Sequence, residues 1–229
     1  MKTITHNGRT HTLNETPSTC PICHYSIAPI DLSTSTFTDV WVDNKTHLDM
    51  AFQCTNPKCK RMFIAIYERE SKHKSDPHAA YLLQGCAPKV YESPTVSSEI
   101  AEISPGFVKI YNQSNVAEQV GLTDICGVGY RKALEFLLKD YCISKDREKT
   151  ASIKGSTLNQ VIQNFISKTE LKIAAQRAVW LGNDETHYDR VWLDQDIDDL
   201  KALIDLTSAW IRDEILTQQY MNTMTRGNT

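Results

Sequence analysis

Four cysteines in the first sixty residues are the side chains best suited to chemistry. Cys20 and Cys23 bound the segment CPIC, and Cys54 and Cys59 bound the segment CTNPKC. Zinc is held by four thiolate or imidazole ligands in a tetrahedron, and two short knuckles brought together by strands supply that geometry. Because four protein ligands leave no open coordination position, we expect a structural Zn²⁺ at these four cysteines and no catalysis by the metal.

Two alternatives to this four-cysteine zinc site are open: a different fourth ligand, or no metal at all. One thiolate could be replaced by another side chain of the same region, namely His24, His47, His73, His78 or Cys86. The four cysteines could also be buried thiols without a metal, although the Thr, Pro, Asn and Lys residues around them fit burial poorly. An odd total of seven cysteines and the lack of an export signal argue against a disulfide framework, and Cys126 and Cys142, among apolar neighbours, are assigned to packing.

A small basic cluster follows the second knuckle: Lys58, Lys60 and Arg61. These side chains are candidates for contacts to DNA or RNA phosphates, and the alternative is a solvated surface. The net charge of the whole chain is −3. Residues 1–90 hold 10 Lys and Arg against 8 Asp and Glu, so neither part of the chain is the strongly basic footprint typical of nucleic-acid-binding domains.

Short runs of aromatic and β-branched residues predict strands within residues 37–42, 48–52, 62–67 and 80–83, separated by Asn, Asp and Pro breaks. We therefore predict an α+β protein whose residues 20–90 form a zinc-ribbon-like small β module. Residues 1–19 are polar and lack a period, which predicts a loosely ordered arm. Residues 91–104, with Pro and several Ser, predict a linker.

From residue 105 onward the apolar period changes to 3.6, which predicts a bundle of about five helices over residues 105–229. Their apolar stripes fall within residues 107–111, 130–141, 158–166, 171–181 and 197–215. Ser156 or Thr157 is placed to cap the third helix. An acidic start to the last helix suits the positive end of a helix dipole.

The helical part resembles a known family. The stretches GVGYRKALEFLLKDYC (127–142) and AQRAVWLGNDETHYDRVW (175–192), before the acidic start of the final helix, are similar to a helical domain family that occurs alone, behind zinc ribbons, and fused to type I restriction subunits. That family is similar to the HEPN superfamily of helical bundles, many of which are RNA-cleaving toxins and antiviral nucleases. The resemblance covers roughly residues 103–217 and implies a homodimer.

Active HEPN proteins carry an Arg followed directly by a polar residue, and a His lies four residues after that polar residue. At the matching place this chain has Gly182, Asn183 and His187, so the resemblance makes Asn183 and His187 candidate catalytic residues but lacks the Arg. Loss of such a transition-state donor costs about 3 to 4 kcal/mol, so we expect little or no nuclease activity unless Arg177, Arg190 or a partner subunit supplies the charge. The alternative is that Asn183 and His187 tie helices together through buried hydrogen bonds while Gly182 permits a tight turn.

These patterns favour a non-catalytic module that binds nucleic acid or protein, and the resemblance links it to defence against foreign nucleic acid. One alternative is a metal-independent HEPN-type endoribonuclease or toxin using His187, and another is a protein-binding adaptor of a restriction or antiphage system. The first residues lack the apolar stretch of a secretory signal, and no run of about 18 apolar residues occurs, so we expect a cytoplasmic protein without a membrane partner.

Overall fold

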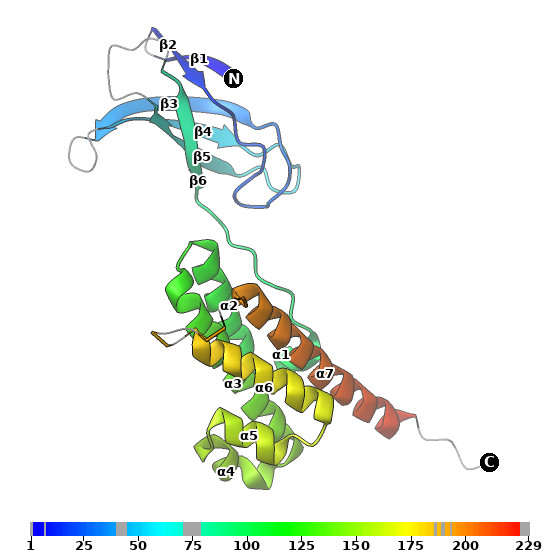
Figure 1. The fold of residues 1–229 in the computed structure, drawn as a ribbon. Helices are drawn as coiled ribbons and strands as arrows, with labels where there is room; N and C mark the ends of the chain where they lie inside the picture. The colour runs from blue at the N-terminus through cyan, green and yellow to red at the C-terminus, as the bar shows by residue number, and fades with distance from the viewer. Residues whose placement is uncertain are drawn as a thin grey trace. The chain divides into compact units, whose positions relative to one another are not determined.

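The computed structural model describes residues 2–6, 8–39, 45–70, 79–185, 187–188, 191–192 and 194–224. The chain divides into two compact units, Met1–Tyr91 and Glu92–Thr229, and each has its own hydrophobic core (Figure 1). Strands build the first unit and helices build the second, which confirms the predicted α+β class. Among the described helices, none combines the length and the apolar character that a membrane span requires.

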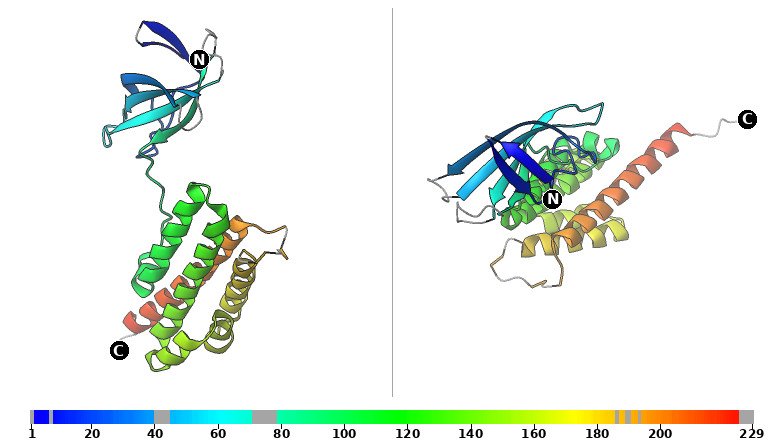
Figure 2. Two further views of the ribbon diagram at one scale, coloured as in Figure 1. Left: turned by 90° about the vertical axis from the view of Figure 1, so that its left-hand side faces the viewer. Right: turned by 90° about the horizontal axis from the view of Figure 1, so that it is seen from above.

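Six strands form one nearly closed sheet in the first unit, in the order β1-β2-β6-β5-β4-β3 (Figure 2). Their bounds are β1 (Lys2–His6), β2 (Arg9–Leu13), β3 (Ile30–Asp39), β4 (Lys45–Gln53), β5 (Met62–Arg69) and β6 (Tyr81–Ala87). Strands β3, β4, β5 and β6 pair with one another in antiparallel order, whereas β2 pairs with β6 in parallel. The two strands at the ends of this order are joined by an ion pair of 2.5 Å between Lys2 Nζ and Asp31 Oδ2.

The core of the β unit comes from alternation along the strands. On β5 the side chains of Phe63, Ala65 and Tyr67 are buried, and the residues between them face outward. Strand β4 buries a matching set, and the rings of Phe52 and Phe63 stack with centroids 5.8 Å apart. This period of two is the pattern of a sheet with one face packed on a core.

The first residues differ from the expected loose arm, because Lys2–His6 and Arg9–Leu13 pair as an antiparallel hairpin. Gly8 makes the turn with a φ of 70°, a value that glycine adopts without a steric penalty. Leu13 is fully buried, and Asn14 Oδ1 accepts a hydrogen bond from the Leu83 N–H. The Thr residues that made the segment look polar are β-branched and suit strands.

Helices and one short 3₁₀ turn form the second unit. Their bounds are α1 (Ser98–Ile103), α2 (Pro105–Gln119), α3 (Thr123–Lys145), η1 (Arg147–Lys149), α4 (Thr150–Gly155), α5 (Leu158–Phe165), α6 (Thr169–Asp184) and α7 (Ile197–Thr223). The five predicted stripes lie on α2, α3, α5, α6 and α7. Part of the segment expected as a linker instead forms α1, and Ile100 of this helix is buried in the helical core.

Side-chain caps fix where two of the helices begin. Thr157 caps α5 in a capping box with Gln160, and Asp196 caps α7 in a capping box with Asp199. Thr157 is one of the two caps predicted for the third helix, and Asp196 belongs to the predicted acidic start of the last helix, although a capping box was not predicted there. Farther along the bundle, buried tyrosines tie helices together: the hydroxyl of Tyr130 donates to Glu118 Oε2 at 2.6 Å, and that of Tyr141 donates to Glu214 Oε2 at 2.7 Å.

Candidate metal centre

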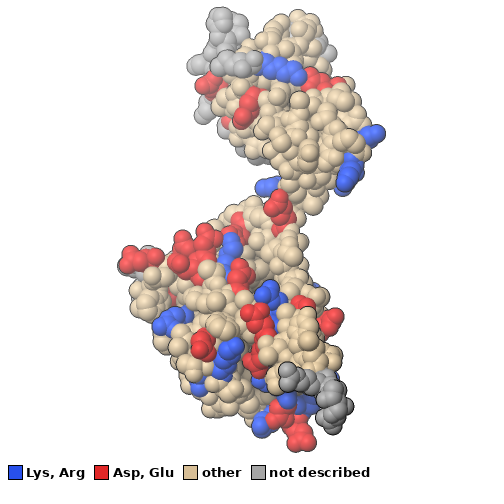
Figure 3. Space-filling view, turned by 90° about the vertical axis from the view of Figure 1, so that its right-hand side faces the viewer, with Lys and Arg blue, Asp and Glu red and all other residues tan. Residues whose placement is uncertain are grey.

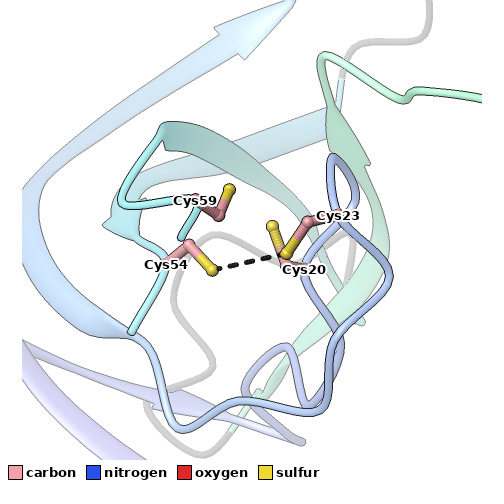
Figure 4. Close-up of side chains that lie close together, drawn as sticks. All are labelled: Cys20, Cys23, Cys54 and Cys59. Atoms are coloured by element: carbon pink, nitrogen blue, oxygen red, sulfur yellow. Dashed lines mark hydrogen bonds between the residues drawn. The ribbon is translucent and has the colours of Figure 1, made fainter. Parts of the chain in front are cut away.

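The four predicted cysteines meet at one place in the β unit. Cys20 and Cys23 come from the connection between β2 and β3, and Cys54 and Cys59 come from the connection between β4 and β5 (Figure 4). All four Sγ atoms lie within 4.8 Å of one another, and Cys23 Sγ lies 3.8 Å from Cys54 Sγ. Cys20 and Cys54 are buried, and none of the seven cysteines forms a disulfide.

Local turns aim the first pair of thiols inward. The Cys20 N–H donates to the Tyr25 carbonyl and the His24 N–H donates to the Cys20 carbonyl, each at 3.0 Å, so the chain folds back directly after CPIC. His24 has a φ of 55°, in the left-handed region. The backbone bridge between Thr19 and Ser26 closes the base of this knuckle.

The second knuckle is organised by Asn56, a residue that the sequence patterns did not single out. Its side-chain Oδ1 accepts from the Lys58 N–H at 3.0 Å, and its carbonyl accepts from the N–H groups of Cys59 and Lys60. Its own N–H donates to Cys54 Sγ at 3.4 Å, and its Nδ2 donates across the site to Cys23 Sγ at 3.6 Å. Asn56 therefore both shapes the longer turn of CTNPKC and stabilises sulfur in both knuckles.

The pKa values of two thiols are shifted in opposite directions. A backbone hydrogen bond from Tyr25 lowers the pKa of Cys23 to about 7, whereas burial raises the pKa of Cys54 to about 12. A metal cation would stabilise this group of thiols, because it binds their thiolate form and compensates the free-energy cost of burying the negative charge. The N–H···S bonds at Cys23 and Cys54 stabilise the same thiolate form.

The sulfur atoms lie close enough together for all four to contact one metal ion. With zinc–sulfur bonds of about 2.3 Å, neighbouring sulfurs of a tetrahedron lie about 3.8 Å apart, which is the spacing from Cys23 to Cys54. Four clustered cysteines can thus bind a metal ion such as zinc. Among the described residues, His24, His47 and Cys86 lie outside this cluster, and the alternatives His73 and His78 fall outside the described residues.

The predicted basic cluster lies on the knuckle that carries Cys54 and Cys59. Lys58, Lys60 and Arg61 are all exposed, and Arg61 directly precedes β5. The Lys60 carbonyl accepts from Gln53 Nε2 at 3.2 Å, and the Arg61 carbonyl accepts from the Cys54 N–H at 3.0 Å. The metal site and the basic cluster therefore share one turn, whose shape the ligands of the metal would hold.

In the helical unit, the predicted catalytic residues lie at the end of α6 and just beyond it. Asn183 Oδ1 accepts a hydrogen bond of 2.5 Å from Arg131 Nε on α3. His187 is exposed, and its backbone N–H donates to the Asp184 carbonyl at 3.2 Å. The carboxylate of Asp184 is buried and accepts from the N–H groups of Val191 and Trp192 at 2.7 and 3.0 Å.

Gly182, the position that lacks the expected arginine, lies inside α6 rather than in the tight turn suggested by the sequence, and it has a packing role. A Cβ placed on Gly182 would lie 2.9 Å from Arg131 Cβ and 3.0 Å from Arg131 Cγ, so glycine lets α6 approach α3. Arg131 also pairs with Glu135 at 3.6 Å, the helical i to i+4 pair that the sequence suggests. Of the two arginines considered as substitutes, Arg177 is exposed on α6, and Arg190 falls outside the described residues.

Charge is mixed over the helical unit, as the face drawn in Figure 3 shows, with basic and acidic side chains interspersed. Cys126 and Cys142 are 1% and 3% exposed and belong to the helical core, which confirms their assignment to packing. No protein-family model, curated protein or solved structure matches the chain.

Proposed function

We propose that the four cysteines hold one structural Zn²⁺ and that the β unit they stabilise is a non-catalytic binding module for a protein partner. Cys20, Cys23, Cys54 and Cys59 would complete the coordination of the ion, which leaves no position for a substrate. The metal then contributes to the free energy of folding and to the shape of the two knuckles.

The outward face of β5 supports a protein partner. Met62, Ile64 and Ile66 are 60%, 44% and 36% exposed, although β5 lies inside the order of strands, between β6 and β4. Small residues flank Ile64 in its row of the sheet, where Ala51 on β4 and Ala87 on β6 are its partners. The stripe Met62-Ile64-Ile66 is therefore open to an aliphatic partner surface, as at the apolar centre of protein interfaces.

The basic residues beside the stripe indicate that the partner also carries acidic side chains. Lys58, Lys60 and Arg61 stand at the end of the stripe where β5 begins, so a partner segment that combines apolar side chains with Asp or Glu complements both features. Single-stranded nucleic acid favours basic grooves with stacking aromatic rings, but the stripe is aliphatic. The apolar stripe beside the cations is the observation that carries the proposal.

Binding of peptides to the zinc-loaded full chain tests this function. The probes are synthetic peptides in which Leu or Ile alternates with Glu, together with single-stranded RNA and DNA of mixed sequence. We expect the peptides to bind, Ile64→Ser to weaken them by about tenfold or more, and neutralisation of Lys58, Lys60 and Arg61 to reduce the salt dependence. Val120→Ser, which changes a side chain of the helical unit with the same 44% exposure, is the matched control.

Two results would overturn the protein-binding function. The first is peptide binding that is absent, or that Ile64→Ser and Val120→Ser affect equally. The second is binding of RNA or DNA that depends on Lys58, Lys60 and Arg61 but not on Ile64, which would replace the protein partner with nucleic acid.

One observation favours a second candidate, an endoribonuclease. The Arg131 guanidinium bonds to Asn183, so a positive charge stands beside this residue although Gly182 replaces the expected arginine. In such an enzyme the 2′-hydroxyl loses its proton to a water molecule and attacks the adjacent phosphorus to form a 2′,3′-cyclic phosphate, while the P–O5′ bond breaks and His187 protonates the leaving 5′-oxygen. Cleavage of RNA by the full chain that His187→Ala abolishes, with an unchanged circular dichroism spectrum, would support this candidate; equal cleavage by both proteins would exclude it.

A further inference from the structure

A cavity opens in the helical unit, away from every residue considered so far as a site. Its volume is about 390 Å³, within the range of pockets that hold small molecules. The segment Pro94–Ser97 forms one wall, and helices α1, α2 and α7 form the others. Residues of all these elements belong to the same compact unit, so the cavity is a property of the bundle itself.

Opposite charges line this cavity, and both come from α7. Asp205 and Arg212 are seven residues apart, so their Cα atoms are separated by about 10 Å along the helix axis. The Tyr111 hydroxyl donates to Asp205 Oδ1 at 3.3 Å, and burial raises the pKa of Asp205. Arg212 donates from Nε and Nη2 to Asp213 Oδ1, and a guanidinium has further N–H donors for a second anion.

Between the two charges lies a hydroxyl that lacks a partner. Ser208 Oγ is buried and has no hydrogen-bond partner among the described residues, and Ser208 lines the cavity. A buried polar atom without a partner costs free energy, so a ligand that reaches Ser208 Oγ would gain a hydrogen bond there. The rest of the lining is mixed: Thr95 and Ser97 are polar, and Ile100 and Phe107 belong to the helical core.

We propose that this cavity binds a small zwitterion of dipeptide size, with its amine toward Asp205, its carboxylate toward Arg212 and an apolar side chain against Phe107. The spacing of Asp205 and Arg212 along α7 favours a ligand whose amine and carboxylate are several bonds apart over a free α-amino acid, in which both groups are attached to one carbon. A dipeptide separates the two groups by several bonds, and its amide can bond to Ser208. The charge pair selects molecules with both ends free.

Isothermal titration of the full chain with Gly-Phe and Ala-Leu tests this site. We expect both dipeptides to bind, and we expect their N-acetylated and C-amidated forms to bind at least about tenfold more weakly, because each cap removes one charged hydrogen bond. Arg212→Gln and Asp205→Asn should each weaken binding by a similar factor. Arg147→Gln, a change of an exposed arginine on η1, is the matched control and should have no effect.

Ser208→Val separates binding from folding. Valine has nearly the shape of the serine it replaces plus one methyl group, and it removes the hydroxyl without a partner, so we expect the melting temperature to hold or rise while dipeptide binding falls. Absence of binding by both dipeptides at millimolar concentration would overturn the proposal. Equal binding of free and capped forms, or equal effects of Arg212→Gln and Arg147→Gln, would overturn it as well.

Discussion

His24 and Lys60 occupy the same position in the two cysteine knuckles and share a left-handed backbone. Each follows the second cysteine of its knuckle, and their φ angles are 55° and 50°. For a residue with a Cβ this conformation costs about 1 to 2 kcal/mol, whereas glycine adopts it freely. Two strained residues at equivalent positions indicate that the convergence of the four thiols requires this turn.

Replacement of either residue by glycine should therefore stabilise the protein. We expect His24→Gly and Lys60→Gly each to raise the unfolding free energy of the zinc-loaded β unit by about 1 kcal/mol, measured by denaturant unfolding with the fluorescence of the β unit as the probe. Thr55→Gly is the control, because this exposed residue of the second knuckle has an ordinary backbone and glycine there should destabilise. Destabilisation by all three changes would show that the left-handed turns carry no strain.

Removal of the metal should affect the two units differently. Mass spectrometry under native conditions should find one zinc per chain, and a chelator should unfold the β unit, since a structural zinc contributes roughly 10 kcal/mol or more to a small domain. The helical unit has its own core, so its circular dichroism signal should remain. Loss of the helical signal together with the β unit would contradict this independence. Serine at both Cys54 and Cys59 should reproduce the effect of the chelator.

Asn56 should set the metal affinity without binding the metal. Asn56→Ala removes the bonds of its side chain to Cys23 Sγ and to the Lys58 N–H. Because residues that orient the ligands of a metal tune its affinity, we expect zinc binding to weaken by about 10- to 100-fold in competition with a chromophoric chelator. Thr55→Ala, at the neighbouring exposed position, serves as the control. An unchanged zinc affinity in Asn56→Ala would contradict this role of the Asn56 side chain and would show that Pro57 and the backbone are sufficient to shape the turn.

The cysteine cluster was predictable because Cys-x₂-Cys and Cys-x₄-Cys segments separated by strands restrict where four sulfurs can lie. The Asn-Pro step at Asn56 was recognised as a break between strands, but its bonds to Cys23 and Cys54 were not predicted, because they depend on how the two knuckles meet. The pairing of β2 with β6 brings together Leu13 and Tyr81, which lie far apart in the sequence, and no local sequence pattern encodes such a contact. The hairpin at the N-terminus was missed because threonine is both polar and favourable in strands.

In the helical unit, the period located α2, α3, α5, α6 and α7, but it missed the short helices α1 and α4, and partners across helices could not be predicted. Gly182 stood out in the sequence chiefly as the place where an arginine is missing. The structure gives the glycine a physical reason, since its lack of a side chain allows contact with Arg131. A pairing of this kind depends on which residue of another helix faces Gly182, and the sequence of one helix does not identify that residue.

A side chain at Gly182 should thus destabilise the bundle. Gly182→Ala places a Cβ 2.9 Å from Arg131 Cβ, so one helix must shift, and we expect a loss of about 1 to 3 kcal/mol in the unfolding free energy. Gly155→Ala on α4 is the matched control, because no atom lies within 4 Å of the new Cβ. There the loss of backbone freedom in the unfolded chain should stabilise by about 0.4 to 1 kcal/mol. Similar effects at the two glycines would contradict the close approach of α3 and α6.

Glu214 should make the stability of the bundle depend on pH. Burial raises the pKa of Glu214, but hydrogen bonds from Lys145 and Tyr141 outweigh it and hold the pKa below the ordinary value of 4.5. A carboxyl group with a lowered pKa in the folded state stabilises it above the unfolded pKa, and this contribution is lost as the pH falls through the folded pKa. Glu214→Gln should therefore cost about 1 to 2 kcal/mol at neutral pH and progressively less in acid.

Chemical unfolding followed by helical circular dichroism, at neutral pH and at about pH 3, measures this difference. Glu102→Gln changes an exposed carboxyl group of α1 and is the control, with an expected effect of less than about 0.5 kcal/mol at both values of pH. Because Tyr141 donates to Oε2 while Lys145 bonds to Oε1, each partner contacts its own oxygen and both depend on the same negative charge. A cost for Glu214→Gln that stays constant down to about pH 3 would show that packing of the side chain, rather than this charge, joins α7 to α3.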